Sequence, residues 1–416
     1  RRGEPLVYAS LLLLGGSLSE RFGARRVLLL GLCGFGGASL VGGFAGWGYP
    51  LLAARACSGA ATACMTPATL ATLKRSFDDR ERPAAIAIWT ASFSVGAAAG
   101  PVLTGLLIAR GAGLGALLLA NIPPIALCAW GSLRLVPIDL PRPERRLDFR
   151  GAALCLSAAA CALFAILAGP SHGWLSPGVV SSAALAAGSL LWARHWLRRA
   201  RQPLIDLSLF SQPRFSKALL VIFLGYFAFS GVSFVVAQYL QLARAKTAFD
   251  SGLLTLPLAG SMLAGTLFAP RLMLRLRPER ALAFSLCAAL FGALLLARAS
   301  DAQSDLLLCC ALFPFGAGCG SAFANATELT LGFVSQERAA TAAALSESAF
   351  EFGGVLGIAV LSSLLGNASL VRATVSERAP RALWLAALAL LCALFVALRL
   401  SRSASARATP SVCSDP

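Results

Sequence analysis

Charged residues are scarce in this chain of 416 residues. They make up 13% of it, against about 25% in a typical soluble domain, while 57% of the residues are hydrophobic. Acids are the scarcer sign, with 19 Asp and Glu against 36 Lys and Arg, and the formal net charge is +17. So little charge excludes an ordinary soluble globular protein. Water is not the main solvent of this chain.

Residues that carry enzyme chemistry are few or dispersed. The only two histidines, His172 and His195, fall in expected loops, and the 12 cysteines lack the spacing of a zinc or redox site. There is no glycine-rich phosphate loop, no nucleophile paired with a base, and no short pore loop of the kind that forms a channel filter. We therefore expect no enzymatic activity, no metal and no cofactor.

Long apolar runs fill the chain instead. About 20 apolar residues are enough to cross a hydrocarbon core ~30 Å thick. The runs end at charged residues or at Gly and Pro, and they predict about 13 transmembrane helices in an all-α integral membrane protein. The predicted spans lie near residues 5–19, 27–47, 50–73, 84–109, 114–136, 151–169, 176–197, 218–240, 251–273, 281–298, 305–331, 339–366 and 382–400.

The basic residues lie mostly between these runs, on one side of the membrane. If the loop from Glu20 to Arg26 is cytoplasmic, roughly three-quarters of the Lys and Arg residues fall on the cytoplasmic side. The net charge therefore reflects membrane topology, and we expect no binding to nucleic acid. The pattern predicts a multi-pass plasma-membrane protein whose loop at 138–149 and C-terminal tail are cytoplasmic.

The chain repeats itself after about 256 residues, which is typical of transporters built from two related halves. The two runs between 151 and 197 have no partner and indicate an insertion. The repeated positions pair Glu81 and Arg82 with Glu337 and Arg338, and Phe93, Gly96 and Gly100 with Phe350, Gly353 and Gly357. The predicted organisation is an N-terminal half at 1–137, two inserted helices at 138–200, a C-terminal half at 201–400 and a tail at 401–416.

The loop after the first run reads GSLSERFGARR from Gly16. It resembles the signature cytoplasmic loop of the major facilitator superfamily, with Glu20 in place of the usual Asp. We expect Gly16 and Gly23 to permit a tight turn, and Glu20 to meet Arg25 or Arg26 and the positive end of a neighbouring helix. Such a latch would stabilise one conformation of a transporter. The alternative is an ordinary basic loop.

A second motif contains an arginine within a predicted span. Arg55 and Gly59 match the R-x-x-Q-G motif of the same superfamily, with Ser58 where Gln is usual. A buried arginine costs roughly 2.5 to 3.5 kcal/mol on membrane insertion scales, so it should face a cavity or a partner. The resemblance implies a role in proton transfer. The alternative is that Arg55 extends to the nearby membrane surface.

The segment GAAAGPVLTG, from Gly96 to Gly105, resembles the antiporter motif of this superfamily, with Thr104 in place of a glycine. Small residues four apart allow close helix packing, and Pro101 after Gly100 should bend the helix. Such a helix can act as a seal or hinge between two cavities. Small-residue packing also occurs in membrane proteins of every function, which is the alternative.

Further stretches are similar to the fourteen-helix drug:proton antiporter family, whose helices follow a plan of six, two inserted, and six. On that plan the chain lacks the first helix, which in this family carries an Asp used in proton coupling. The stretches are ERPAAIAIW at 81–89, PLIDLSLF at 203–210, QYLQ at 238–241 and FGGVLGIAVL at 352–361.

Two acids lie well inside a predicted span. Glu347 and Glu351 stand four residues apart, on one face of a helix and roughly 12 and 18 Å from its start. Two carboxylates so close do not both ionise readily, so we expect the pair to hold a proton until a cation arrives. The alternative is a structural pair. We expect Glu328, in another span, to lie near the cytoplasmic surface.

The resemblance implies proton-coupled export of small amphipathic or cationic compounds, which is multidrug efflux, across a bacterial plasma membrane. We expect the lipid bilayer, protons and a small-molecule substrate to be its partners. Aromatic residues such as Tyr226, Phe227 and Phe229 suit flat cations, and they suit lipid equally well. The alternatives are an exporter of one metabolite, and a non-transporting membrane protein or degenerate fragment. Substrate identity and oligomeric state stay open.

Overall fold

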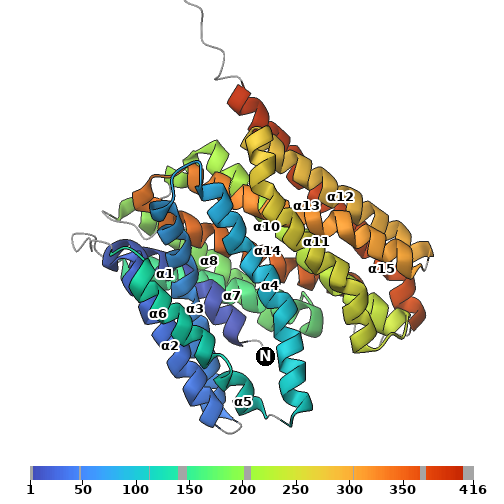
Figure 1. Cartoon of the computed structure of the whole chain (residues 1–416), viewed down its shortest axis with the longest axis horizontal. Coiled ribbons are helices and arrows are strands. Elements are labelled where there is room, and N and C mark those ends of the chain that lie inside the picture. Colours follow the sequence, from blue (N-terminus) through green and yellow to red (C-terminus); the bar gives the residue numbers. More distant parts are fainter. Residues whose placement is uncertain are drawn as a thin grey trace, which may run out of the picture.

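The chain folds into helices packed side by side (Figure 1). The structure is a computed structural model and describes residues 3–45, 48–111, 113–138, 148–200, 208–302, 304–365 and 372–405. Within these ranges all regular secondary structure is helical. Eight of the described helical segments are long and apolar enough to cross a membrane by length and composition. The prediction of an all-α membrane protein is confirmed.

Each predicted apolar run coincides with helical structure over most of its length, residues 46–47 and 366 fall outside the described part, and the run at 114–136 is broken at Ala120 and Asn121. We name α1 to α6 the first helix group and α10 to α15 the second helix group, with α7 and α8 between them. The helices are α1 (Gly3–Phe22), α2 (Ala24–Phe44), α3 (Tyr49–Ser76), α4 (Arg82–Ala109), α5 (Leu114–Leu119), α6 (Ile122–Leu135), α7 (Phe149–His172), α8 (Pro177–Arg199), α9 (Ser208–Ser211), α10 (Pro213–Gln238), α11 (Ala248–Arg275), α12 (Pro278–Ala302), α13 (Asp305–Gly332), α14 (Ala339–Leu365) and α15 (Arg372–Ser405).

The predicted domain boundaries fall beside parts of the chain that the structure does not describe. Residues 139–147 and 201–207 lie outside the described residues, as do residues 406–416 of the predicted tail. These boundaries stay predictions. Within the described part, α7 packs against α8, and Trp196 Nε1 of α8 donates a hydrogen bond to Asp148 Oδ1 at 2.9 Å, just before α7.

Glycine controls how closely the helices approach in the second helix group. A Cβ added at Gly357 of α14 would lie 2.1 Å from the Phe227 carbonyl oxygen of α10, and one at Gly353 would lie 2.4 Å from the Phe223 oxygen. The bare glycine surface therefore lets the two backbones touch. The buried core of this group is continuous from α10 to α15 and consists mainly of Ala, Leu and Val.

The two helix groups meet along several seams. Helix α1 packs on α14, α3 packs on α14, and α4 packs on α11 and α13. Helix α7 lies against both α1 and α14, so the inserted pair contacts each group. These seams bring the ends of α1, α3 and α4 beside the connection from α13 to α14, where the polar contacts between the groups gather.

Candidate functional site: a clamp between helix groups and a buried acid pair

Glu20 joins the first helix group to the start of α14. Its side chain is 3% exposed, and its Oε1 accepts hydrogen bonds from the Thr341 backbone N–H at 2.8 Å and from the Thr341 hydroxyl at 2.6 Å. Thr341 lies in the first turn of α14, where unpaired N–H groups carry partial positive charge. The sequence predicted an acid at the positive end of a neighbouring helix, and the structure places Glu20 at α14.

The other residues of the loop motif take different positions. Gly23 is the only residue between α1 and α2, and its φ of 93° is favourable only for glycine. Gly16 is not part of the turn, and that expectation was wrong. It lies inside α1, where an added Cβ would be 2.9 Å from the Ala340 oxygen, so a glycine here permits close contact with α14. Arg25 donates to the Leu133 carbonyl of α6 at 2.5 Å, and Arg26 is exposed.

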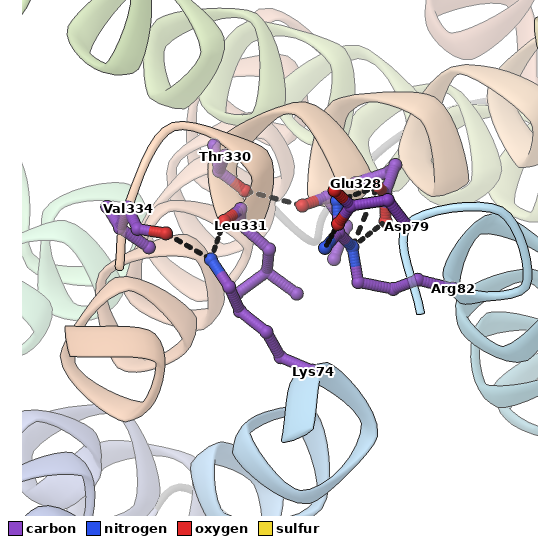
Figure 2. Close-up of polar contacts among 8 residues, drawn as sticks. Lys74, Asp79, Arg82, Glu328, Thr330, Leu331 and Val334 are labelled. Atoms are coloured by element: carbon purple, nitrogen blue, oxygen red, sulfur yellow. Dashed lines mark hydrogen bonds and ion pairs between the residues drawn. The ribbon is translucent and has the colours of Figure 1, made fainter. Parts of the chain in front are cut away.

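Lys74 makes the complementary contact at the end of α13. Its buried ammonium group donates hydrogen bonds to the carbonyl oxygens of Leu331 and Val334 (Figure 2). The last carbonyls of a helix carry partial negative charge, so a cation there is favourable. Lys74 lies just beyond the predicted span at 50–73. Burial lowers the pKa of Lys74 to about 8, and the nearby Arg82 adds to the decrease, against the opposing effects of Glu328 and Asp79.

Arg82 and Glu328 form a buried ion pair between α4 and α13. Arg82 Nη2 lies 2.7 Å from Glu328 Oε1, and Arg82 Nε donates to both carboxylate oxygens at 2.9 and 3.1 Å. The exposed Asp79 carboxylate lies 2.5 Å from Arg82 Nη1 (Figure 2). Glu328 is 6% exposed and lies one turn before the end of α13 at Gly332. Its predicted place near the cytoplasmic surface stays a prediction.

These contacts hold both ends of one connection. We use the name clamp for Glu20, Lys74, Arg82 and their partners on α13 and α14. The end of α13 is held by cations and the start of α14 by an anion, all from the first helix group. The charges of Glu20 and Lys74 match the helix ends that they meet, and Arg82 matches the Glu328 carboxylate, so these contacts favour packing of the two helix groups here.

Glu347 and Glu351 lie further along the clamped helix α14. Glu347 is 6% exposed, and Glu351 is half-buried one turn later. Gly354 follows on the same face, and an added Cβ there would lie 2.9 Å from the Tyr226 ring and 3.0 Å from the Ser230 hydroxyl. The two acids therefore share a face with a residue that packs against polar and aromatic side chains of α10.

Aromatic rings surround this part of α14. Phe350 stands between the two acids in sequence, and its ring meets Tyr226 edge-on with a centroid distance of 5.1 Å. The ring centroid of Phe323 of α13 lies 5.5 Å from that of Phe350 and 5.3 Å from that of Tyr226. The centroids of Phe229 and Tyr226 are 5.6 Å apart. Tyr226 and Phe229 thus turn toward the helices of the second group, and Phe227 is buried as well.

The remaining predicted residues lie in the first helix group. Arg55 is half-buried near the start of α3, and Ser58 of the same motif is buried. The antiporter motif lies within α4, where Gly96 has no described heavy atom within 4 Å of an added Cβ. The surroundings of Gly100, Pro101 and Gly105 are not described by the structure. The roles predicted for these residues remain hypotheses.

The comparison with known families agrees with this geometry. The model of the Major Facilitator Superfamily matches residues 5–358. This chain belongs to the major facilitator superfamily. As a member it is a multi-pass protein of the bacterial plasma membrane that carries small-molecule substrates.

Two relatives match most of the chain. The first is the multidrug resistance protein Stp of Mycobacterium tuberculosis, which is 29% identical over 378 residues. This match covers 90% of this chain and 69% of Stp. The chain is 30% identical to the tetracenomycin C resistance and export protein of Streptomyces glaucescens, over 88% of this chain and 68% of that protein. Among solved structures, the human organic anion transporter MFSD10 matches with a TM-score of 0.69 at 18% identity, covering 94% of this chain and 81% of MFSD10.

Two residues of the clamp, Lys74 and Arg82, were not predicted from the sequence as functional residues. No motif marks Lys74 in the sequence, and Arg82 stands out only through the internal repeat and the family-like stretch at 81–89. A usable signal was present, because both cations stand at the ends of predicted spans, where a helix end of opposite sign can approach them. What the sequence lacked was the identity of that helix.

Proposed function

We propose that this transporter exports small amphipathic, often cationic compounds in exchange for protons, by alternating access between the two helix groups. The names of its relatives support the direction and substrate class, since they include a multidrug resistance protein, drug efflux pumps and a tetracenomycin C resistance and export protein. The lysine and arginine asymmetry puts the clamp on the cytoplasmic side. In this proposal the contacts of the clamp close the transporter toward the cytoplasm.

The observation that carries the proposal is that one helix holds both the clamp and the acid pair. The start of α14 binds Glu20, and Glu347 and Glu351 lie on the same helix about two to three turns further on. A change in charge at the acids alters how favourably α14 packs in its apolar surroundings. Because α14 is one continuous helix, a tilt at the acids is transmitted to its clamped end.

The acid pair supplies the exchange chemistry. Two carboxylates on one helix face in an apolar environment retain a proton, because ionising both leaves two like charges close together. An arriving cation stabilises the second negative charge, and the proton leaves. The half-buried rings of Tyr226 and Phe350 lie in contact next to the acids and suit flat cations, and the buried Phe323 ring packs against both. Binding of the cation and loss of the proton are therefore linked.

The test is proton release on substrate addition. The protein is purified in detergent, and a pH-sensitive dye records protons released when tetraphenylphosphonium is added. We expect release from the parent, and loss of release from at least one of Glu347→Gln and Glu351→Gln. The matched control is Glu377→Gln, which changes an exposed glutamate of α15 and should release protons like the parent. Retained release in both acid variants would show that the acids are structural.

A dedicated exporter is the second candidate, and one observation favours it. The Streptomyces relative is named for the export of a single compound, tetracenomycin C. In proteoliposomes, a multidrug exporter should transport several unrelated cations and a dedicated exporter none of them. Proton release without transport of any cation would favour the dedicated exporter. A chain that neither transports nor releases protons would favour a non-transporting protein.

A further inference from the structure

An apolar groove lies outside the acid pair and the clamp, on the first helix group. It has a volume of about 650 Å³, within the range of about 300–1,000 Å³ that is usual for ligand sites. It is formed by α1, α2 and α3, and every residue that lines it is Gly, Ala, Cys or a larger apolar residue. On α2 the lining runs from Val27 to Val41, a length of roughly 21 Å.

Glycines of α2 keep this groove open. Gly37 lines it, and no described heavy atom lies within 4 Å of a Cβ added there. A Cβ added at Gly34, one turn away, would meet only the Ala61 Cβ, at 3.4 Å. Across from them, α3 presents the small side chains of Cys57 and Ala60. The space lies within predicted membrane spans, so a long apolar chain fits it better than water does.

One end of the groove carries positive charge. Phe22 lines that end and is 40% exposed, and the Arg21 guanidinium lies 5.2 Å from the centre of its ring. The exposed Arg26 directly precedes Val27, the first groove residue of α2. Neither Arg21 nor Arg26 forms an ion pair with an acid of the described residues. Guanidinium groups match phosphate oxygens in geometry and charge.

We propose that this groove binds one acyl chain of an anionic glycerophospholipid of the inner leaflet, whose phosphate meets Arg21 and Arg26. Among the described lining residues none has a polar group that would orient a drug. The charged end of the groove lies where the predicted topology puts the inner-leaflet headgroups. The same turn carries Glu20 and Gly23. The bound lipid therefore sits beside the clamp and stabilises the turn from which Glu20 reaches α14.

The test measures lipid binding to the purified whole chain by native mass spectrometry. Phosphatidylglycerol and phosphatidylcholine with identical acyl chains are titrated separately. We expect the parent to bind phosphatidylglycerol roughly tenfold or more tightly than phosphatidylcholine, because two arginines lie near the phosphate. Arg21→Gln with Arg26→Gln should remove this preference while acyl-chain binding persists. Arg110→Gln, an exposed arginine after α4, is the matched control and should change nothing.

Filling the groove tests the acyl-chain site itself. Gly37→Leu places a side chain into the open space, since no described heavy atom lies within 4 Å of a Cβ there, and we expect about tenfold weaker binding of both lipids. Cys57→Leu fills the groove from α3 and should weaken lipid binding to the same extent. It replaces Gly37→Leu as the test if that variant does not fold. Gly188→Leu is the control, since Gly188 of α8 is also exposed with no described atom within 4 Å.

Three outcomes would overturn the proposal. Equal affinity of the parent for the two lipids would exclude a headgroup site. Unchanged lipid binding in folded Gly37→Leu and Cys57→Leu would exclude the groove. Displacement of the bound lipid by ethidium, with both filling variants weakening ethidium binding, would make the groove a drug site instead. Because the acid pair is intact in every variant, proton release on addition of tetraphenylphosphonium separately tests the proposed function.

Discussion

Glu20 and Thr341 lie 321 positions apart in the chain, and two hydrogen bonds join them in the fold. Both bonds go to the same carboxylate oxygen, one from the backbone and one from the hydroxyl of Thr341. The contact therefore combines a helix cap with a charge-assisted side-chain bond across two helix groups. Opening the cytoplasmic end requires both bonds to break or to be replaced by water.

Removing the Thr341 hydroxyl should favour the open cytoplasmic end. Thr341→Val keeps the shape and the backbone N–H but loses one bond to the Glu20 carboxylate. A hydrogen bond to a charged group contributes about 1.5 to 3 kcal/mol, so the closed-to-open ratio should fall roughly tenfold or more. Double electron–electron resonance measures the closed-to-open ratio as a distribution of distances between spin labels. The labels are placed at the exposed positions Ser76 and Gln336 in a cysteine-depleted background.

Thr341→Ser is the control for that substitution, because it keeps the hydroxyl and should leave the distance distribution near that of the parent. If Thr341→Val and Thr341→Ser give the same distribution as the parent, the contact with Glu20 does not govern closure.

Breaking the buried ion pair from one side should destabilise the protein more than removing both charges. Arg82→Gln or Glu328→Gln leaves the other charge buried, which costs about 3 to 5 kcal/mol. We expect both single variants to melt well below the parent in detergent, and the double variant to recover part of the loss. Asp79→Asn is the control, since that side chain is 90% exposed and should change melting little. If the decrease in melting temperature of the double variant equals the sum of the two single decreases, the pairing is contradicted.

Alkaline pH should strengthen the clamp through Lys74. In the closed state the pKa of Lys74 is about 8, and on opening it should return toward its ordinary 10.5. Between these values the open state binds more protons, so raising the pH favours the closed state. Below about pH 8 both states are protonated and Lys74 contributes no pH dependence. The closed fraction, measured with the same spin labels, should rise from about pH 8 to about 10.5, and Lys74→Met should abolish that rise.

The two repeated glycines should respond differently to the same substitution. Gly353→Ala brings a Cβ to 2.4 Å from the Phe223 oxygen, so α10 and α14 must move apart. Gly96, its partner in the repeat, has no described heavy atom within 4 Å. We expect Gly353→Ala to lower the melting temperature by several degrees and Gly96→Ala to have little effect. Equal losses from the two variants would contradict the packing difference.

The sequence predicts most of the secondary structure, for a local reason. Apolar runs of membrane length, bounded by charges, indicate where each helix lies, because a helix satisfies its own backbone hydrogen bonds within one segment. The shared face of Glu347 and Glu351 is likewise set by helical periodicity alone. The turn at Gly23 follows from the conformational freedom of glycine.

Only the tertiary structure decides which helix ends meet. It pairs Glu20 with α14, Lys74 with the last carbonyls of α13, and Arg82 with Glu328. It also assigns Gly16 to a helix contact rather than to the turn. These contacts join residues more than 240 positions apart, and spacing along a chain holds no information about which helices become neighbours. The charges and helix ends are present in the sequence, and packing between the two helix groups determines how they pair.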